Sequence, residues 1–153
     1  MSYTSWSAPS LSWITPTTGT VRAKDIGRIS VSVRIGNTGT RLSSRPLLLF
    51  AQRLEEATGT IADNADDVLT TIVWPNKWLV AFGKAMAVKP GGESALTLSF
   101  GEDEMSRWIG KPTATAAATA NAGGFSVVPG RYLLTAIDQR GNSVPGGLTL
   151  SVV

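Results

Sequence analysis

Closely spaced acidic side chains are the residues of this chain that could do chemistry. They occur as Glu55–Glu56, Asp66–Asp67 and Glu102–Glu104, in a sequence of 153 residues without Cys or His. Hydrolysis of a glycosidic bond, for example, needs two carboxylates about 5–5.5 Å or 6.5–9.5 Å apart in a cleft. Neighbouring acids in polar segments more often cap helices or remain solvated, so we do not expect a catalytic pair. Without His and Cys, Ser-His-Asp arrangements and thiol nucleophiles are excluded.

The same acids raise the alternative of a calcium site. Calcium takes six to eight oxygen ligands in a fixed array. The run from Asp63 to Asp67 (Asp-Asn-Ala-Asp-Asp) lacks the spacing and the glycine of an EF-hand loop. We therefore favour a solvated loop over a calcium loop, and we expect no metal and no other cofactor.

Tryptophan is abundant, with five residues in the chain. Trp78 lies within an apolar run and is expected in the core, whereas Trp6, Trp13, Trp74 and Trp108 lie in arm or loop contexts. Exposed Trp can stack on sugar rings, which would make a carbohydrate-binding face. The alternative is that these four side chains clamp the arm and loops onto the domain or fill a protein contact, since large exposed apolar patches commonly mark partners. We favour the second interpretation.

Strands must position these side chains. Residues 29–35 alternate strictly between apolar and polar, which is typical of a half-buried strand. Residues 94–100 alternate likewise, with Leu96, Leu98 and Phe100 expected inward. The continuous apolar run 46–51 predicts a central strand covered on both faces. Further strands are predicted at 78–88, 125–128, 131–137 and 148–153, and Phe82 and Tyr132 are expected to supply core area.

Loops and turns separate these strands. Residues 1–20 are rich in Ser, Thr and Pro and are expected to form an extended arm, followed by one β-sandwich domain over residues 21–153. Long loops are predicted at 52–73 and 111–124, a short helical turn at 101–108 and a hairpin at 138–142. Several short strands with regular turn signals indicate an all-β sandwich.

Charge and hydropathy exclude two classes of partner. The chain has 14 Lys and Arg against 11 Asp and Glu, a net charge of +3, and the basic residues are scattered singly. This pattern does not predict nucleic-acid binding. No apolar run approaches 18 residues, so we expect no membrane span, and the N-terminus as written does not resemble a signal peptide. The compartment stays open, with an extracellular or virion-surface setting among the alternatives.

Four motifs carry a resemblance to a known family. They are residues 74–82 (Trp-Pro-Asn-Lys-Trp-Leu-Val-Ala-Phe), residues 90–100 (beginning Pro-Gly-Gly-Glu), residues 124–134 (Gly-Phe-Ser-Val-Val-Pro-Gly-Arg-Tyr-Leu-Leu) and residues 31–39. Together they resemble the C-terminal fibronectin type III-like domain of family 3 glycoside hydrolases, and the first motif is closest to the fungal-type β-xylosidase and β-glucosidase branch. The resemblance implies a fibronectin type III-like, immunoglobulin-like β-sandwich.

The resemblance also implies a function. In that family the catalytic carboxylates belong mainly to the preceding domains, so no catalytic residue transfers to this sequence and we expect no enzyme activity. The sandwich there is an accessory domain. We therefore expect a non-catalytic module in protein–protein interaction or self-assembly, either as a structural component of a larger particle, such as a virion decoration protein, or as an accessory domain of a glycosidase system. Carbohydrate binding through exposed Trp is the alternative.

Overall fold

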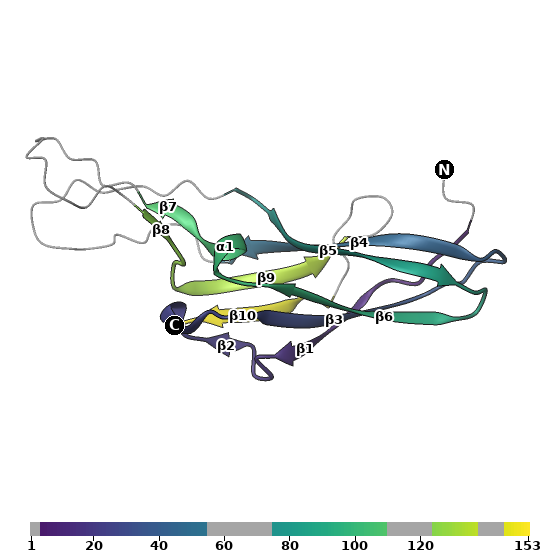
Figure 1. The fold of residues 1–153 in the computed structure, drawn as a ribbon, viewed down its shortest axis with the longest axis horizontal. Coiled ribbons are helices and arrows are strands. Elements are labelled where there is room, and N and C mark those ends of the chain that lie inside the picture. Colours follow the sequence, from purple (N-terminus) through teal and green to yellow (C-terminus); the bar gives the residue numbers. More distant parts are fainter. Residues whose placement is uncertain (1–3, 55–74, 110–123, 138–145) are drawn as a thin grey trace, which may run out of the picture.

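The computed structural model describes residues 4–54, 75–109, 124–137 and 146–153 (Figure 1). Most of the loop predicted at 52–73, most of the loop at 111–124 and the hairpin tip at 138–142 lie outside the described residues. The described part is an all-β sandwich with two short helical turns, η1 (Ala23–Asp25) and α1 (Glu102–Met105). This confirms the fold class, and α1 falls where a helical turn was predicted. No helix in these ranges is long and apolar enough to cross a membrane.

One layer of the sandwich has three antiparallel strands. Their order is β1 (Ser10–Thr15), β3 (Ile29–Gly36) and β6 (Glu93–Phe100), with β3 in the middle. Strict alternation along β3 buries Ile29, Val31, Val33 and Ile35 on one face, as predicted. Leu98 and Phe100 are buried beside them on β6, and Leu96 is half-buried.

The other layer has five strands in the described part of the chain. Their order is β2 (Thr20–Val21), β10 (Leu148–Val152), β9 (Gly130–Ala136), β4 (Ser43–Arg53) and β5 (Trp78–Val88). β2 pairs with β10 in parallel, and the other pairs are antiparallel. A separate ribbon consists of β7 (Arg107–Ile109) and β8 (Gly124–Ser126).

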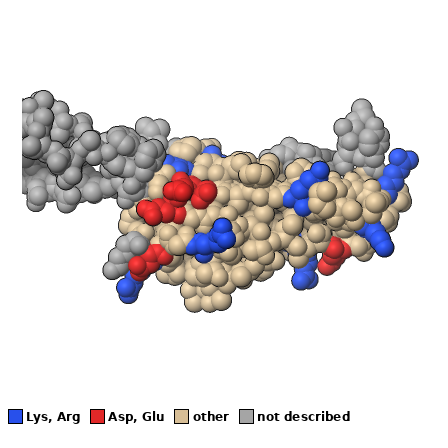
Figure 2. Space-filling model, viewed as in Figure 1, with Lys and Arg blue, Asp and Glu red and all other residues tan. Residues whose placement is uncertain are grey.

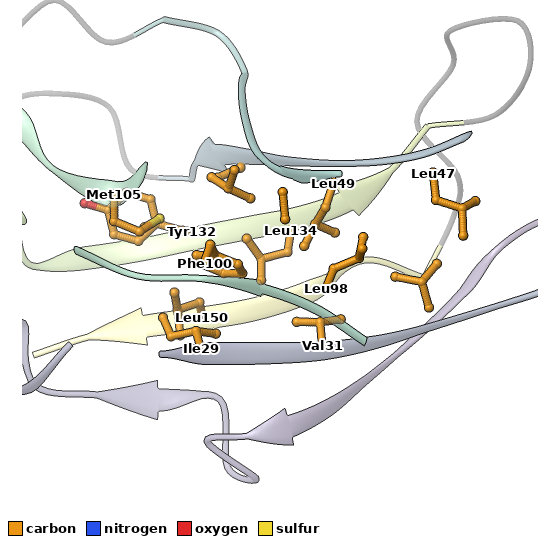
Figure 3. Packing of buried hydrophobic residues seen from close by; sticks show 14 of the residues in the cluster. Ile29, Val31, Leu47, Leu49, Leu98, Phe100, Met105, Tyr132, Leu134 and Leu150 are labelled. Atoms are coloured by element: carbon orange, nitrogen blue, oxygen red, sulfur yellow. The ribbon is translucent and has the colours of Figure 1, made fainter. Parts of the chain in front are cut away.

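The core fills the space between the two sheets (Figure 3). Leu49 of β4, Leu134 of β9 and Leu150 of β10 point toward Val31 of β3 and Leu98 of β6. Tyr132 is completely buried, and its hydroxyl donates a hydrogen bond to the carbonyl of Val128. Burial of Tyr132 and Leu98 is as the sequence predicted.

Strand β5 differs from its prediction because it contains two β-bulges. Leu49 pairs with Ala81 and Phe50 with Leu79, so Val80 is an extra residue, and Val80 and Ala81 are both buried. The bulge shifts the inward–outward phase by one residue. Phe82, expected in the core, therefore points outward and is 74% exposed.

The second bulge lies between the pairs Ser43–Val88 and Arg45–Ala85. Ala87 has a positive φ of 50° there, and its amide donates to Ser44 Oγ at 2.9 Å. The extra residue returns Val88 to the core. β4 is central, as predicted, but Pro46 and Leu48 on its outer side are exposed, because no layer in the described part packs on them.

The expected N-terminal arm is extended but belongs to the sandwich. Residues 10–15 form β1, an edge strand paired with β3. Upstream, Trp6 forms an isolated bridge with Asn37, and Ser7 Oγ accepts a hydrogen bond from the amide of Gly36 at 2.8 Å. Residues 10–15 and 20–21 thus contribute one strand to each of the two sheets.

Candidate interaction surface

The outer side of strands β4 and β5 carries a row of exposed apolar side chains. Phe82 is 74% exposed, Met86 65%, Leu79 44% and Leu48 37%. Phe82 pairs directly with Leu48, and Leu79 with the half-buried Phe50, so the row is continuous across both strands. Side chains of this size expose roughly 150–250 Å² when fully free, so these four leave roughly 400 Å² of apolar surface. The largest apolar patch of a monomer, typically about 300–600 Å², often has a function.

The charge of this surface is one-sided. Lys84 is exposed on the same side of β5, between Phe82 and Met86, and pairs with Pro46. The segments 43–54 and 77–92 contain no Asp or Glu, and their exposed charged side chains are Lys77, Lys84 and Lys89. We call the surface made by Leu48, Leu79, Phe82, Met86 and Lys84 the β4–β5 face. It is apolar with a cation in its middle.

The outer side of the three-stranded sheet has a different character. Small hydroxyl residues meet across its strands, as in the pairs Ser12–Ser32 and Ser32–Thr97, and Ser30 Oγ lies 3.0 Å from Ser99 Oγ. Its exposed ion pair joins Arg34 and Glu93 at 3.9 Å, and such pairs contribute little to stability. The sandwich therefore has a hydroxyl-rich surface on the three-stranded sheet and an apolar surface over β4 and β5 of the other sheet.

Trp6 and Trp13, predicted interaction residues, contact their own domain. Trp6 is half-buried, and the guanidinium carbon of the buried Arg45 lies 6.0 Å from its ring centroid. Trp13 is half-buried against the core, and its indole nitrogen covers Gly19, where a Cβ would lie only 2.9 Å from it. Both side chains therefore contact the sandwich of their own chain, and a contact with a partner stays a prediction.

The structure does not place the other two predicted interaction residues, Trp74 and Trp108, beside Trp6 and Trp13. Trp74 lies outside the described residues. For Trp108 the structure describes only the backbone, which pairs with Phe125 in the β7–β8 ribbon. The residues of the β4–β5 face were missed by the sequence analysis. A run of apolar residues without strict alternation was the available signal, but the bulges that set its phase leave no clear mark in the sequence.

The side chain of Trp78 contacts three other residues of the fold. The guanidinium carbon of Arg107 lies 4.1 Å from its ring centroid, a cation–π contact, and the Tyr132 ring meets it edge-on at 6.0 Å. Its indole Nε1 donates to the carbonyl of Glu104 at 3.1 Å. Burial lowers the pKa of the Arg107 guanidinium, and Tyr132 partly opposes this by raising it. Arg107 stays charged at neutral pH, so a charged group covers the ring of Trp78.

The acids that sequence analysis considered for chemistry do not form a site in the described residues. Glu102, Asp103 and Glu104 are exposed on α1, where negative charge gathers in Figure 2. Glu104 Oε2 accepts a hydrogen bond from the amide of Gly101 at 2.8 Å, which caps the helical turn. The acids at 55–67 lie outside the described ranges, and within those ranges no group of three or more acidic side chains could hold a metal ion.

Comparisons with known proteins agree with this fold. No family model matches the sequence, and no curated protein matches it. Among solved structures, β-glucosidase 3B from Thermotoga neapolitana in complex with glucose has a TM-score of 0.64 and 19% identity over 99% of this chain. A β-glucosidase from Listeria innocua in complex with isofagomine has a TM-score of 0.65 and 15% identity over 99%, and a β-glucosidase from Erythrobacter marinus has 0.62 and 22% over 100%.

The chain spans only 16% of the length of each of these three proteins. At these identities the likeness concerns the fold. It agrees with the resemblance to family 3 glycoside hydrolases that the sequence motifs carry. The chain thus has the β-sandwich fold of a small part of family 3 β-glucosidases.

Proposed function

We propose that this chain is a non-catalytic accessory module that binds a protein through the β4–β5 face. The observation that carries the proposal is the exposed row of Leu48, Leu79, Phe82 and Met86 on adjacent strands. Single exposed apolar residues are ordinary, but a contiguous exposed patch of them often marks a contact site. Aromatic residues and Met are also enriched in protein–protein contacts.

The chemistry of the face favours a protein over a sugar. A sugar-binding platform combines an aromatic ring with polar groups that pair with ring hydroxyls. Here the neighbours of Phe82 on its own side are Leu48, Leu79 and Lys84. Aliphatic neighbours give no acceptor for sugar hydroxyls, whereas they extend an apolar contact. Trp78, another aromatic of β5, is covered by Arg107.

Two observations support a role without catalysis. The carboxylate of Glu104 is engaged as a cap, with exposed acids beside it on the surface of α1. The chain also matches only 16% of β-glucosidases such as the Thermotoga enzyme. An accessory part in a glycosidase system or in a larger assembly fits both observations.

A phage-displayed library of random dodecapeptides tests the proposal while the natural partner is still unidentified. Exposed apolar patches capture such peptides readily, so binders selected on the wild-type protein should lose binding to Phe82→Ser. They should retain binding to Leu42→Ser, a control that removes an exposed apolar side chain, 60% exposed, between β3 and β4. Circular dichroism should show both variants folded. Binders that ignore Phe82→Ser would contradict the proposal, and binding to a glycan array that Phe82→Ser abolishes would support carbohydrate recognition instead.

A further inference from the structure

We infer that the partner of the β4–β5 face presents an apolar surface that carries carboxylates, and that it packs on the sheet face instead of adding a strand to β5. This inference rests on the proposed function and specifies the chemistry of the partner. Two features of the described residues carry it: the place of Lys84 among apolar side chains and the bulged edge of β5.

Lys84 lies on the edge strand β5, flanked along the strand by apolar side chains. It is on the outer side of β5 between Phe82 and Met86, and faces Pro46 across the strand pair. A partner that covers Phe82 and Met86 also removes water from the Lys84 ammonium. An ammonium that loses water without a partner is strongly unfavourable, and a carboxylate opposite it compensates. Such a pairing fixes the register of a contact and its specificity.

Two more lysines extend this charge along β5. Lys77 precedes the strand and Lys89 follows it, and both are exposed. At about 3.3 Å per residue, they lie roughly 23 Å and 17 Å from Lys84 along the strand. No acid occurs between residues 77 and 92 in the sequence. A partner with carboxylates along this line is attracted before contact, and its association rate falls with ionic strength.

A second copy of this chain is a poorer match. Two copies that meet through the same face place two apolar patches against each other without complementary charges, which are what give a contact its specificity. The β4–β5 face of a second copy carries its own Lys84, and strands β4 and β5 contain no Asp or Glu that could pair with the Lys84 of the first copy.

The edge of β5 argues against strand addition. An added strand needs a regular row of free amides and carbonyls along the edge. Both bulges interrupt that row, and at the second bulge the amide of Ala87 turns inward to Ser44 Oγ. Bulges and lysines on edge strands are common devices that block edge-to-edge pairing. The partner therefore approaches the face of the sheet.

The test uses two synthetic amphipathic helical peptides of equal length, each with a Leu and Phe stripe. Glu flanks the stripe in one peptide and Lys flanks it in the other. NMR titration of the labelled protein should show shifts at Phe82, Lys84 and Met86, with the acidic peptide bound about tenfold more tightly than the basic one. Lys84→Glu should reverse this preference, and Arg34→Glu, an exposed charge reversal on the opposite sheet, should leave it unchanged.

The outcomes separate the inference from the proposed function. Equal binding of both peptides at the β4–β5 face overturns the carboxylate inference and leaves the proposed function standing. Shifts confined to other surfaces contradict both. Self-association in sedimentation velocity that Phe82→Ser abolishes makes a second copy the partner and overturns the inference. New protection of edge amides of β5 in hydrogen exchange, with no shifts on the face, reveals strand addition and overturns it too.

Discussion

Replacing Asn37 with Ala should destabilise the sandwich more than any other substitution of a polar residue in a turn. Asn37 is 1% exposed and follows β3. Its Oδ1 accepts from Thr4 Oγ1 at 2.9 Å and from the Gly39 amide at 3.0 Å. Its Nδ2 donates to the carbonyls of Arg41 at 2.7 Å and Val88 at 2.8 Å. One side chain therefore joins the N-terminal segment, the turn after β3 and the end of β5.

The magnitude follows from these four hydrogen bonds. A hydrogen bond contributes about 1 ± 0.5 kcal/mol net, and a buried group left without a partner costs about 1–3 kcal/mol. Asn37→Ala should thus lower the free energy of unfolding by about 4 kcal/mol, a large share of the 5–15 kcal/mol that domains have. For a chain of this size the melting temperature should fall by about 8–16 °C.

Urea denaturation followed by tryptophan fluorescence measures this change. Thr4→Ala removes one of the four bonds and should cost about 1 kcal/mol. Thr38→Ala is the control, because its side chain is exposed beside Asn37 and should change stability by less than about 0.5 kcal/mol. A loss below about 1 kcal/mol for Asn37→Ala, with an unchanged m-value, would refute the reasoning, because water would then replace the side chain at little cost.

Three further predictions concern the core, the bulge and activity. Leu98→Ala and Tyr132→Ala should each lower the free energy of unfolding by about 2–5 kcal/mol in urea titrations, since both are buried between the sheets, and unchanged midpoints would contradict the packing. Ala87→Gly should raise the free energy of unfolding by up to about 1 kcal/mol, because the gain from relieving a positive φ exceeds the added entropy of the unfolded chain. Ala87→Val should lower the free energy of unfolding by at least about 1 kcal/mol. Equal melting curves for the three proteins would show that the backbone at residue 87 is not strained. The protein should release no aryl alcohol from aryl glucosides or xylosides beyond that of a Glu104→Gln control, and higher release by the wild type would show catalysis.

Regular alternation made part of the fold predictable. In β3 every second residue from Ile29 to Ile35 is β-branched and apolar, so the pattern indicates both the strand and its buried face. Tyr132 and Leu98 follow from the same rule on β9 and β6. Where strands are regular, a period of two residues is enough to assign the core.

The candidate site could not be predicted in the same way. Phe82 was expected in the core as a large aromatic residue, and the bulge at Val80 turns it outward instead. The role of Asn37 depends on Thr4 and Val88, which are 33 and 51 residues away in sequence. Bulges and distant hydrogen bonds arise from tertiary packing, so local patterns carry no record of them.

The parallel pairing of β2 with β10 gives the module a mechanical property. Three backbone hydrogen bonds join the two segments. The amide of Ser151 donates to the carbonyl of Gly19 at 2.8 Å, and the amide of Val153 donates to the carbonyl of Val21 at 2.9 Å. The amide of Ala23 donates to the carbonyl of Val153 at 2.7 Å. The described N-terminal segment and the C-terminus lie at opposite ends of the long axis (Figure 1), so tension between them runs along the strands. Once load has passed the pairing of β1 with β3, it reaches these bonds in shear, and they must then rupture together instead of one after another. In an optical trap, Ala23→Pro, which removes one of them, should therefore lower the force at which β2 separates from β10.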